Sequence, residues 1–178
     1  KSQDDEYAAK HNIRAGVGLA AIQIGLLKRM FVIYYPDSEG NIVQYQLVNP
    51  KIIETSVKKC ALSSGEGCLS VDKNHDGLSH RYYKIKMEAF DALQNKNITI
   101  NATGFDAIVL QHEYDHLEGM FYYDRINKLS PNEPLTNEEI RNILINDFTN
   151  LKQAIQRILY AKRVLKISNN ITFSPETK

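Results

Sequence analysis

The sequence has few cysteines, no long hydrophobic run and almost no excess of charge, and each shortage excludes a class of protein. Two cysteines in 178 residues are too few for the disulfide framework of a small secreted domain. No apolar stretch reaches the length of a membrane-spanning helix, and no basic and then apolar leader opens the chain. With 22 basic and 21 acidic residues, the formal charge of +1 gives no general attraction to nucleic acid or membranes. We therefore expect a soluble, cytoplasmic protein without membrane contact.

The composition is that of an ordinary globular protein, with 43% hydrophobic and 24% charged residues. A chain of this length can bury one sizeable core. We expect one main domain over residues 1–128 and a helical extension over residues 129–178. Because the chain begins with Lys1 and not with methionine, we also expect that an upstream segment is missing.

The most informative stretch is Gln111–Leu117, which contains the pattern His-Glu-x-x-His. A helix turns once every 3.6 residues, so His112 and His116 lie on one face, where a single metal ion can join them. Glu113 projects beside them. In this pattern the histidines hold the metal and the carboxylate handles the proton of the attacking water.

Signals for a helix surround this pattern. Thr103 is a suitable N-cap and Gly119 a suitable stop, which predicts a helix from Gly104 to Glu118. One apolar face accompanies the histidines and comprises Phe105, Ile108 and Val109. The opposite face comprises Ala107, Leu110, Tyr114 and Leu117. A helix that is apolar on two sides is buried, so we expect the metal at the floor of an apolar cavity.

The rest of the first 128 residues reads mainly as strands. Residues 2–12 are compatible with a short helix. β-Branched and aromatic residues predict strands at Met30–Tyr35, Ile42–Val48, Ile52–Val57, His80–Phe90 and Ile98–Ile100, with turns at 36–41 and 94–97. We expect an α+β fold in which antiparallel sheets pack around a central helix that carries the His-Glu-x-x-His pattern.

An additional C-terminal helix is predicted over residues 136–167. Thr136 and Glu139 form a capping box, and apolar residues recur at helical spacing from Ile140 to Leu159. The second half carries five basic residues and no acid, namely Lys152, Arg157, Lys162, Arg163 and Lys166. A solvated face is the usual explanation, and contact with RNA is the alternative.

A catalytic metal of this kind normally has three protein ligands and an open position. The metzincin pattern requires a histidine or aspartate at position 122, where this chain has Tyr122. A thermolysin-like protease would use a downstream glutamate, for which the candidates are Glu133, Glu138 and Glu139. The upstream alternative is Cys68, since Gly65 and Gly67 leave the loop free to direct its thiol. Two histidines and one cysteine suit Fe(II) or Zn(II).

Three stretches together resemble the peptide deformylase family. Gly16–Gln23 is similar to its first motif, Glu66–Ser70 to its second and Gln111–His116 to its third, in the family's order and spacing. Ile22 departs from the first motif, in which proline or a small residue is common. The inserted loop Val71–Leu78 resembles the type 2 branch of low-GC Gram-positive bacteria and their relatives, such as the mollicutes.

The resemblance implies removal of the formyl group from N-formylmethionine at the start of nascent polypeptides. It implies one divalent metal ion held by Cys68, His112 and His116, with Fe(II) as the native ion and Zn, Ni or Co as substitutes. Glu113 would transfer the proton. The Gln23 side-chain amide and the Leu69 backbone N–H would stabilise the oxyanion of the tetrahedral intermediate.

The resemblance also implies how the substrate binds. Val17, Phe105, Ile108 and Val109 would surround the methionine side chain, and Gly16, Val17 and Gly18 would pair with the peptide as an added strand. We expect a monomer whose basic C-terminal helix contacts the ribosome. Two other hypotheses remain: a metalloprotease with a glutamate ligand, and a catalytically silent, metal-stabilised module that binds nascent chains.

Overall fold

The computed structural model describes residues 5–11, 15–128 and 130–133, and all structural statements concern this part of the chain. The predicted helix at 136–167, with its basic residues, lies outside the described residues. None of the described helices is long and apolar enough to cross a membrane.

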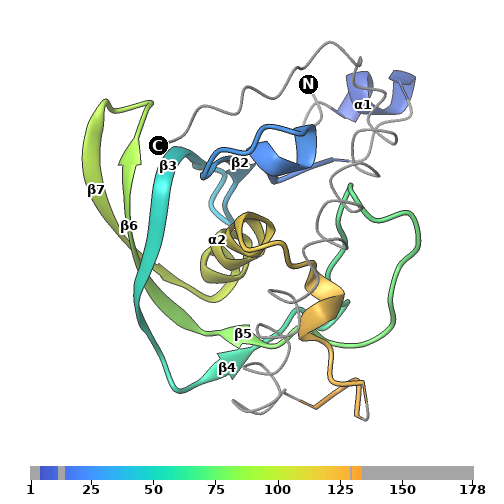
Figure 1. Cartoon of the computed structure of the whole chain (residues 1–178). Coiled ribbons are helices and arrows are strands. Elements are labelled where there is room, and N and C mark those ends of the chain that lie inside the picture. The colour runs from blue at the N-terminus through green and yellow to red at the C-terminus, as the bar shows by residue number, and fades with distance from the viewer. Residues whose placement is uncertain (1–4, 12–14, 129, 134–178) are drawn as a thin grey trace.

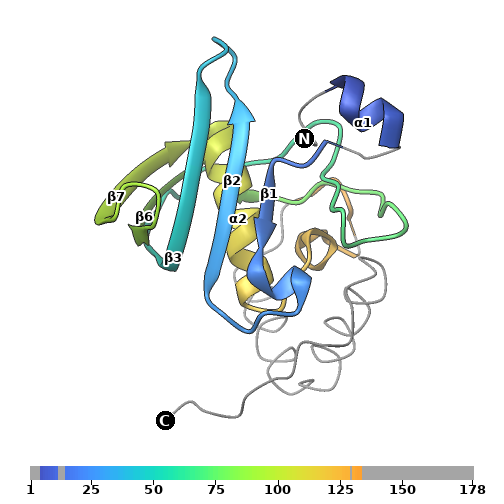
Figure 2. The same ribbon diagram turned by 90° about the horizontal axis from the view of Figure 1, so that it is seen from above.

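The centre of the fold is a five-stranded antiparallel sheet in the order β1-β2-β3-β6-β7 (Figures 1 and 2). Its strands are β1 (Gly18–Ala20), β2 (Met30–Pro36), β3 (Ile42–Thr55), β6 (Lys84–Asp91) and β7 (Lys96–Thr103). A separate two-stranded ribbon pairs β4 (Lys59–Cys60) with β5 (Arg81–Tyr82). The helices are α1 (Asp5–His11), α2 (Gly104–Leu117) and the short 3₁₀ helices η1 (Ala21–Ile24) and η2 (Tyr122–Arg125).

Helix α2 packs on one face of this sheet, and the core lies between them (Figure 1). Alternate residues of each strand point to this face, as the period of two requires. From β2 these are Phe31, Ile33 and Tyr35, and from α2 the core receives Ala107, Val109 and Leu110, with Tyr114 and Leu117 packed against it. The predicted mixed fold, with an antiparallel sheet and a helix, is confirmed.

The prediction of separate strands at Ile42–Val48 and Ile52–Val57 is wrong, because β3 runs without a break from Ile42 to Thr55. A proline normally interrupts a strand because it has no N–H to donate. Here the register shifts between Val48 and Lys51, and Asn49 adopts a positive φ of 50°. This bulge takes up Pro50, so the strand bends and continues.

The prediction of one strand over His80–Phe90 is also wrong. Its first part, β5, pairs with β4, and β6 pairs with β3 and β7. Between them the backbone N–H of Tyr83 donates to Lys58 O at 2.9 Å. Side-chain periodicity alone does not show that neighbouring residues pair with different partners. Because of this division, Arg81 belongs to the β4–β5 ribbon, where its side chain is fully buried.

Candidate active site

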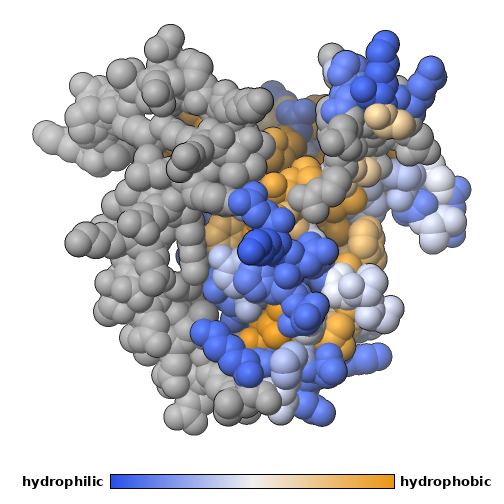
Figure 3. Space-filling model, turned by 90° about the vertical axis from the view of Figure 1, so that its right-hand side faces the viewer, coloured by the Kyte–Doolittle hydropathy of each residue, from blue (hydrophilic) through white to orange (hydrophobic). Residues whose placement is uncertain are grey.

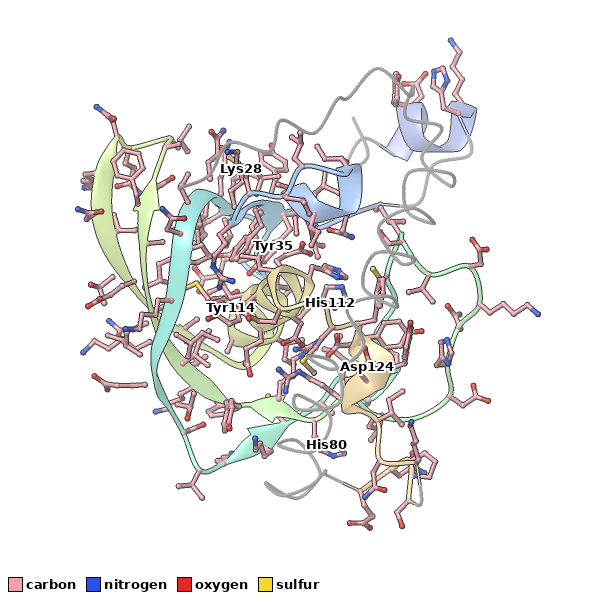
Figure 4. All side chains as sticks on the ribbon, viewed as in Figure 1. Lys28, Tyr35, His80, His112, Tyr114 and Asp124 are labelled. Atoms are coloured by element: carbon pink, nitrogen blue, oxygen red, sulfur yellow. The ribbon has the colours of Figure 1, made fainter. Side chains whose placement is uncertain are left out.

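Helix α2 delivers its polar residues to the side away from the sheet. It follows β7 directly, with Thr103 extended at the N-cap and Gly104 at a φ of 57°. The Thr103 side chain makes no capping hydrogen bond, so its position was predicted correctly but not its contact. Past the end of the helix, Gly119 has a φ of 76°, as expected for a helix stop. Figure 4 shows His112 and Tyr114 on opposite sides of the helix, with Tyr114 toward the sheet.

Cys68, His112 and His116 converge, with one ligand atom from each lying within 4.8 Å of the others. The Sγ of Cys68 lies 3.5 Å from Nε2 of His116. Tetrahedral coordination, with metal–sulfur distances of about 2.3 Å and metal–nitrogen distances of about 2.0 Å, separates two such ligand atoms by about 3.5 Å. The residues therefore fit a metal ion. Among the described residues, the metal-binding group does not include Glu133.

Cys68 reaches the helix from the loop before the β5 strand. Gly65 adopts a φ of 73°, which favours glycine, and Val71 N–H closes a turn on Cys68 O at 3.1 Å. The thiol side chain is buried beside Tyr122 and Ile126. The position of the thiol is thus fixed by the loop and by the segment after α2. Cys60, the other cysteine, lies half-buried in β4 and outside the metal-binding group.

The two histidines occupy different electrostatic environments. Nδ1 of His112 lies 2.8 Å from Glu66 Oε2, so the ring donates to this carboxylate and its Nε2 remains for the site. Burial opposes protonation of His112, but hydrogen bonds to Cys68 and Glu66 raise its pKa to about 10, so a cation that binds Nε2 must displace a proton there. Burial and the neighbouring His112 lower the pKa of His116 to about 3. His116 is therefore neutral at pH 7 and has an electron pair to offer a cation.

Glu113 is a buried carboxylate with an incomplete set of hydrogen bonds. Its side chain is almost fully buried, and Oε2 has no hydrogen-bond partner among the described residues. Burial raises the pKa of Glu113 to about 7, although the charges of His112 and Arg81 oppose the shift. An acid whose pKa lies near neutral pH can both accept and return a proton.

Gln23 lies on η1 against the same site. Its Oε1 accepts the Ala20 N–H at 2.7 Å, which fixes the amide so that Nε2 points toward the loop. This Nε2 donates to Ser70 Oγ at 2.9 Å and lies 3.7 Å from Cys68 Sγ. The amide hydrogens are thus held beside the metal-binding group. Leu69 follows Cys68 and lines the adjoining cavity.

A cavity of about 310 Å³ opens beside these residues. All the predicted substrate-binding residues line it, namely Gly16, Val17, Gly18, Phe105, Ile108 and Val109. Cys68, His112, Glu113 and Gln23 also line it, whereas His116 is not among the lining residues. On the face that lies to the right in Figure 1, hydrophobic surface is visible between hydrophilic residues (Figure 3). Phe105 and Leu69 are 45% and 37% exposed, so apolar groups at the cavity remain accessible to a ligand.

The sequence did not indicate that Glu66 is the hydrogen-bond partner of His112. Glu66 also forms an ion pair with Arg81, at 2.6 Å from Nε to Oε1. The residues that flank the histidines bond elsewhere: Gln111 bonds the Tyr82 backbone, and Asp115 pairs with two arginines. The only signal for Glu66 was its place two residues before Cys68.

Comparison with known proteins gives a consistent result. The family model "Polypeptide deformylase" matches residues 5–132. "Peptide deformylase 2" of Bacillus subtilis is 48% identical over 130 residues, which are 73% of this chain and 70% of that protein. The Geobacillus stearothermophilus protein of the same name is 47% identical with the same coverage. A solved peptide deformylase from Ehrlichia chaffeensis has a TM-score of 0.56 and 31% identity, covering 83% of this chain and 80% of that one.

Proposed function

Because the chain belongs to the polypeptide deformylase family, we propose that Cys68, His112 and His116 hold the metal ion used by this family. The chain is a hydrolase that removes the N-formyl group from nascent polypeptides and releases formate. Its relatives include proteins of Geobacillus, Bacillus and Staphylococcus, which are low-GC Gram-positive bacteria, as the type 2 resemblance predicted. The observation that carries the proposed site is the convergence of one sulfur and two ring nitrogens beside a buried glutamate.

The donor set supports a borderline-soft divalent ion. One thiolate and two imidazoles suit Fe(II), Zn(II), Ni(II) and Co(II), and we propose Fe(II) as the native ion. When bound, such an ion supplies a Lewis acid for the formyl carbonyl and lowers the pKa of water. The hydrogen bond to Glu66 orients the His112 ring for this role. His116 is neutral at pH 7 and so has an electron pair for the ion.

Glu113 is the proposed proton carrier. Its carboxylate takes a proton from the attacking water as oxygen bonds to the formyl carbon. It then returns that proton to the peptide nitrogen as the carbon–nitrogen bond breaks, so that formate and a free amine leave. The pKa of about 7 suits both directions of transfer. The uncommitted Oε2 provides an acceptor in the cavity wall.

Negative charge on the formyl oxygen requires donors that are already in place. We propose the Gln23 amide, whose Nε2 lies 3.7 Å from Cys68 Sγ, and the backbone N–H of Leu69, the residue after Cys68. Gln23 is well suited, because its bond from Ala20 N–H fixes which end of the amide faces the site. Its bond to Ser70 holds the same orientation from the loop side.

The peptide is proposed to bind along β1. The Tyr34 N–H donates to Val17 O at 3.0 Å, so Val17 faces β2. Successive residues of an antiparallel strand point their backbone groups to alternate edges, which directs those of Gly18 away from β2. Since β1 is the edge strand of the described sheet, this edge can receive a peptide strand. Val17, Phe105, Ile108 and Val109 would then surround the methionine.

Several finer predictions belong to this proposal. We propose that residues 1–128 form the catalytic domain, since the family match ends at residue 132. Nascent formylated chains arise in the cytoplasm, which supports cytoplasmic action. The monomeric state and a ribosome contact through the basic residues of 136–167 stay predictions, because that segment lies outside the described residues.

Cys68→Ser tests the metal ligands, with Cys60→Ser as the matched control. Protein purified without oxygen is assayed for metal content and for formate release from formyl-Met-Ala-Ser. We expect the first variant to lose or exchange its metal and to lose activity, and the second to retain both. A Cys68→Ser protein with full metal content would favour the glutamate-ligated protease. Unchanged function after Glu113→Ala would favour the silent binding module.

A further inference from the structure

A continuous chain of buried charges runs from η2 to His112. Arg125 pairs with Asp115 through both ends of its guanidinium group. Asp115 Oδ2 accepts from Arg81 Nη1 at 2.7 Å, and Arg81 donates from Nε and Nη2 to the two oxygens of Glu66 at 2.6 and 2.9 Å. Glu66 Oε2 lies 2.8 Å from His112 Nδ1. Four successive residue pairs therefore connect Arg125 to His112, the proposed metal ligand.

The chain is shielded from water along its length. The side chain of Arg81 is 0% exposed, those of Glu66 and Asp115 are 3% exposed, and Arg125 is 15% exposed. Two guanidinium groups balance two carboxylates, so the cluster is neutral when His112 is neutral. In such surroundings each charge depends on its partners, and loss of one partner leaves another charge uncompensated.

Each pairing restricts the next one. Arg125 and Arg81 both bind Asp115, which leaves its carboxylate little freedom to rotate. Asp115 binds Nη1 of Arg81, so the other two nitrogens of the guanidinium group, Nε and Nη2, face Glu66. With both oxygens bound to these two nitrogens, the Glu66 carboxylate has one orientation in which to accept His112 Nδ1–H.

We propose that Arg125 is a positioning residue that orients His112 through Asp115, Arg81 and Glu66 and thereby strengthens metal binding. This inference rests on the proposed metal site. Arg125 belongs to η2, outside the three motifs of the family resemblance, and its contacts in this chain lead to His112 only through other residues. The competing explanation is that Arg125 merely stabilises the fold.

The test compares Arg125→Met with Arg29→Met in the full chain. Arg29 makes an ion pair at 2.6 Å with Glu118, the C-cap residue of α2, so the control removes an arginine whose acidic partner lies three residues after Asp115 and outside the buried cluster. Co(II) affinity is measured by competition with a chelator, and the Co(II) absorption bands report ligand geometry. Partners beyond the first ligands typically change affinity about 10- to 100-fold, and we expect roughly a tenfold loss for Arg125→Met. We expect altered absorption bands for this variant, and an unchanged Co(II) affinity and unchanged bands for the control.

A double-mutant cycle with Glu66→Gln separates positioning from general stability. If Arg125 acts through Glu66, adding Arg125→Met to Glu66→Gln lowers Co(II) affinity no further. Equal losses in both backgrounds, or unchanged affinity and bands in Arg125→Met, would overturn the inference while leaving the metal site intact. Failure of the unmodified protein to bind Co(II) would overturn the metal site and this inference together. Circular dichroism and thermal unfolding establish that the compared variants are folded.

Discussion

Gly18→Ala provides a sharp test of the Glu113 position. A Cβ at residue 18 would lie 2.4 Å from Glu113 Oε1, 2.6 Å from Cδ and 2.7 Å from Cγ. Ordinary carbon contacts begin near 3.4 Å, so the carboxylate would have to move by about 1 Å. Glu113 is buried, which leaves little space for that movement. The variant tests whether the reaction depends on this placement.

A displacement of about 1 Å in a reacting group can cost about 100-fold in rate, which corresponds to about 2.7 kcal/mol in the activation free energy. We expect kcat for formate release to fall by roughly that factor, while metal content stays unchanged because the three atoms nearest the new methyl group all belong to Glu113 and not to a proposed metal ligand. The overpacked core should also lose about 1–3 kcal/mol in the free energy of unfolding. Both quantities are measured on one preparation, by steady-state kinetics and by denaturant unfolding.

Gly67→Ala is the matched control. It lies beside Cys68, and an added Cβ there meets nothing within 4 Å. We expect its metal content and kcat to remain close to those of the unmodified protein. A Gly18→Ala variant with unchanged kcat would refute the reasoning, since Glu113 would then work from another position.

Three further predictions concern ionisable groups. Glu113→Gln should lower kcat by about 100-fold or more because it removes the proton acceptor, yet metal analysis should find the ion retained. Burial and the charge of Arg125 lower the pKa of Lys59 from 10.5 to about 8, so charged Lys59 destabilises the fold below pH 8, and this effect disappears as pH rises toward 10.5. Lys59→Met should therefore raise the free energy of unfolding at pH 7 by about 1 kcal/mol, and urea unfolding at pH 7 and pH 10 should show a smaller gain at the higher pH. Although burial opposes it, Arg125 and Arg81 hold the pKa of Asp115 far below 3.8, so its stabilising effect should be complete above that pH and decline as acid is added. Acid titration of unfolding should show a weaker decline in Arg125→Met.

Site residues that lie close together in the sequence were easier to predict than those brought together by the fold. His112 and His116 lie four residues apart, so helical geometry alone places them together. The position of Cys68 depends on how a loop folds over that helix, which no periodicity encodes. From the residues alone, a downstream glutamate remained an alternative to Cys68, and the motif resemblance favoured the cysteine.

The sheet shows a similar limit. Alternating hydrophobicity predicted strands in β2, β3, β6 and β7, but not where their pairing changes. Pro50 suggested an interruption, yet a bulge with Asn49 at positive φ carries β3 past it. The role of Glu66 was hidden for a related reason. Its orientation depends on Arg81, which reaches this loop residue from β5.

The shortness of β1 has a consequence for substrate range. This edge strand has three residues, Gly18–Ala20, so a peptide paired along it meets mainly backbone groups over a brief span. Amide hydrogens and carbonyl oxygens are common to every polypeptide, whatever side chains follow the first methionine. On the proposed geometry, the enzyme would therefore accept formylated peptides of widely different sequence.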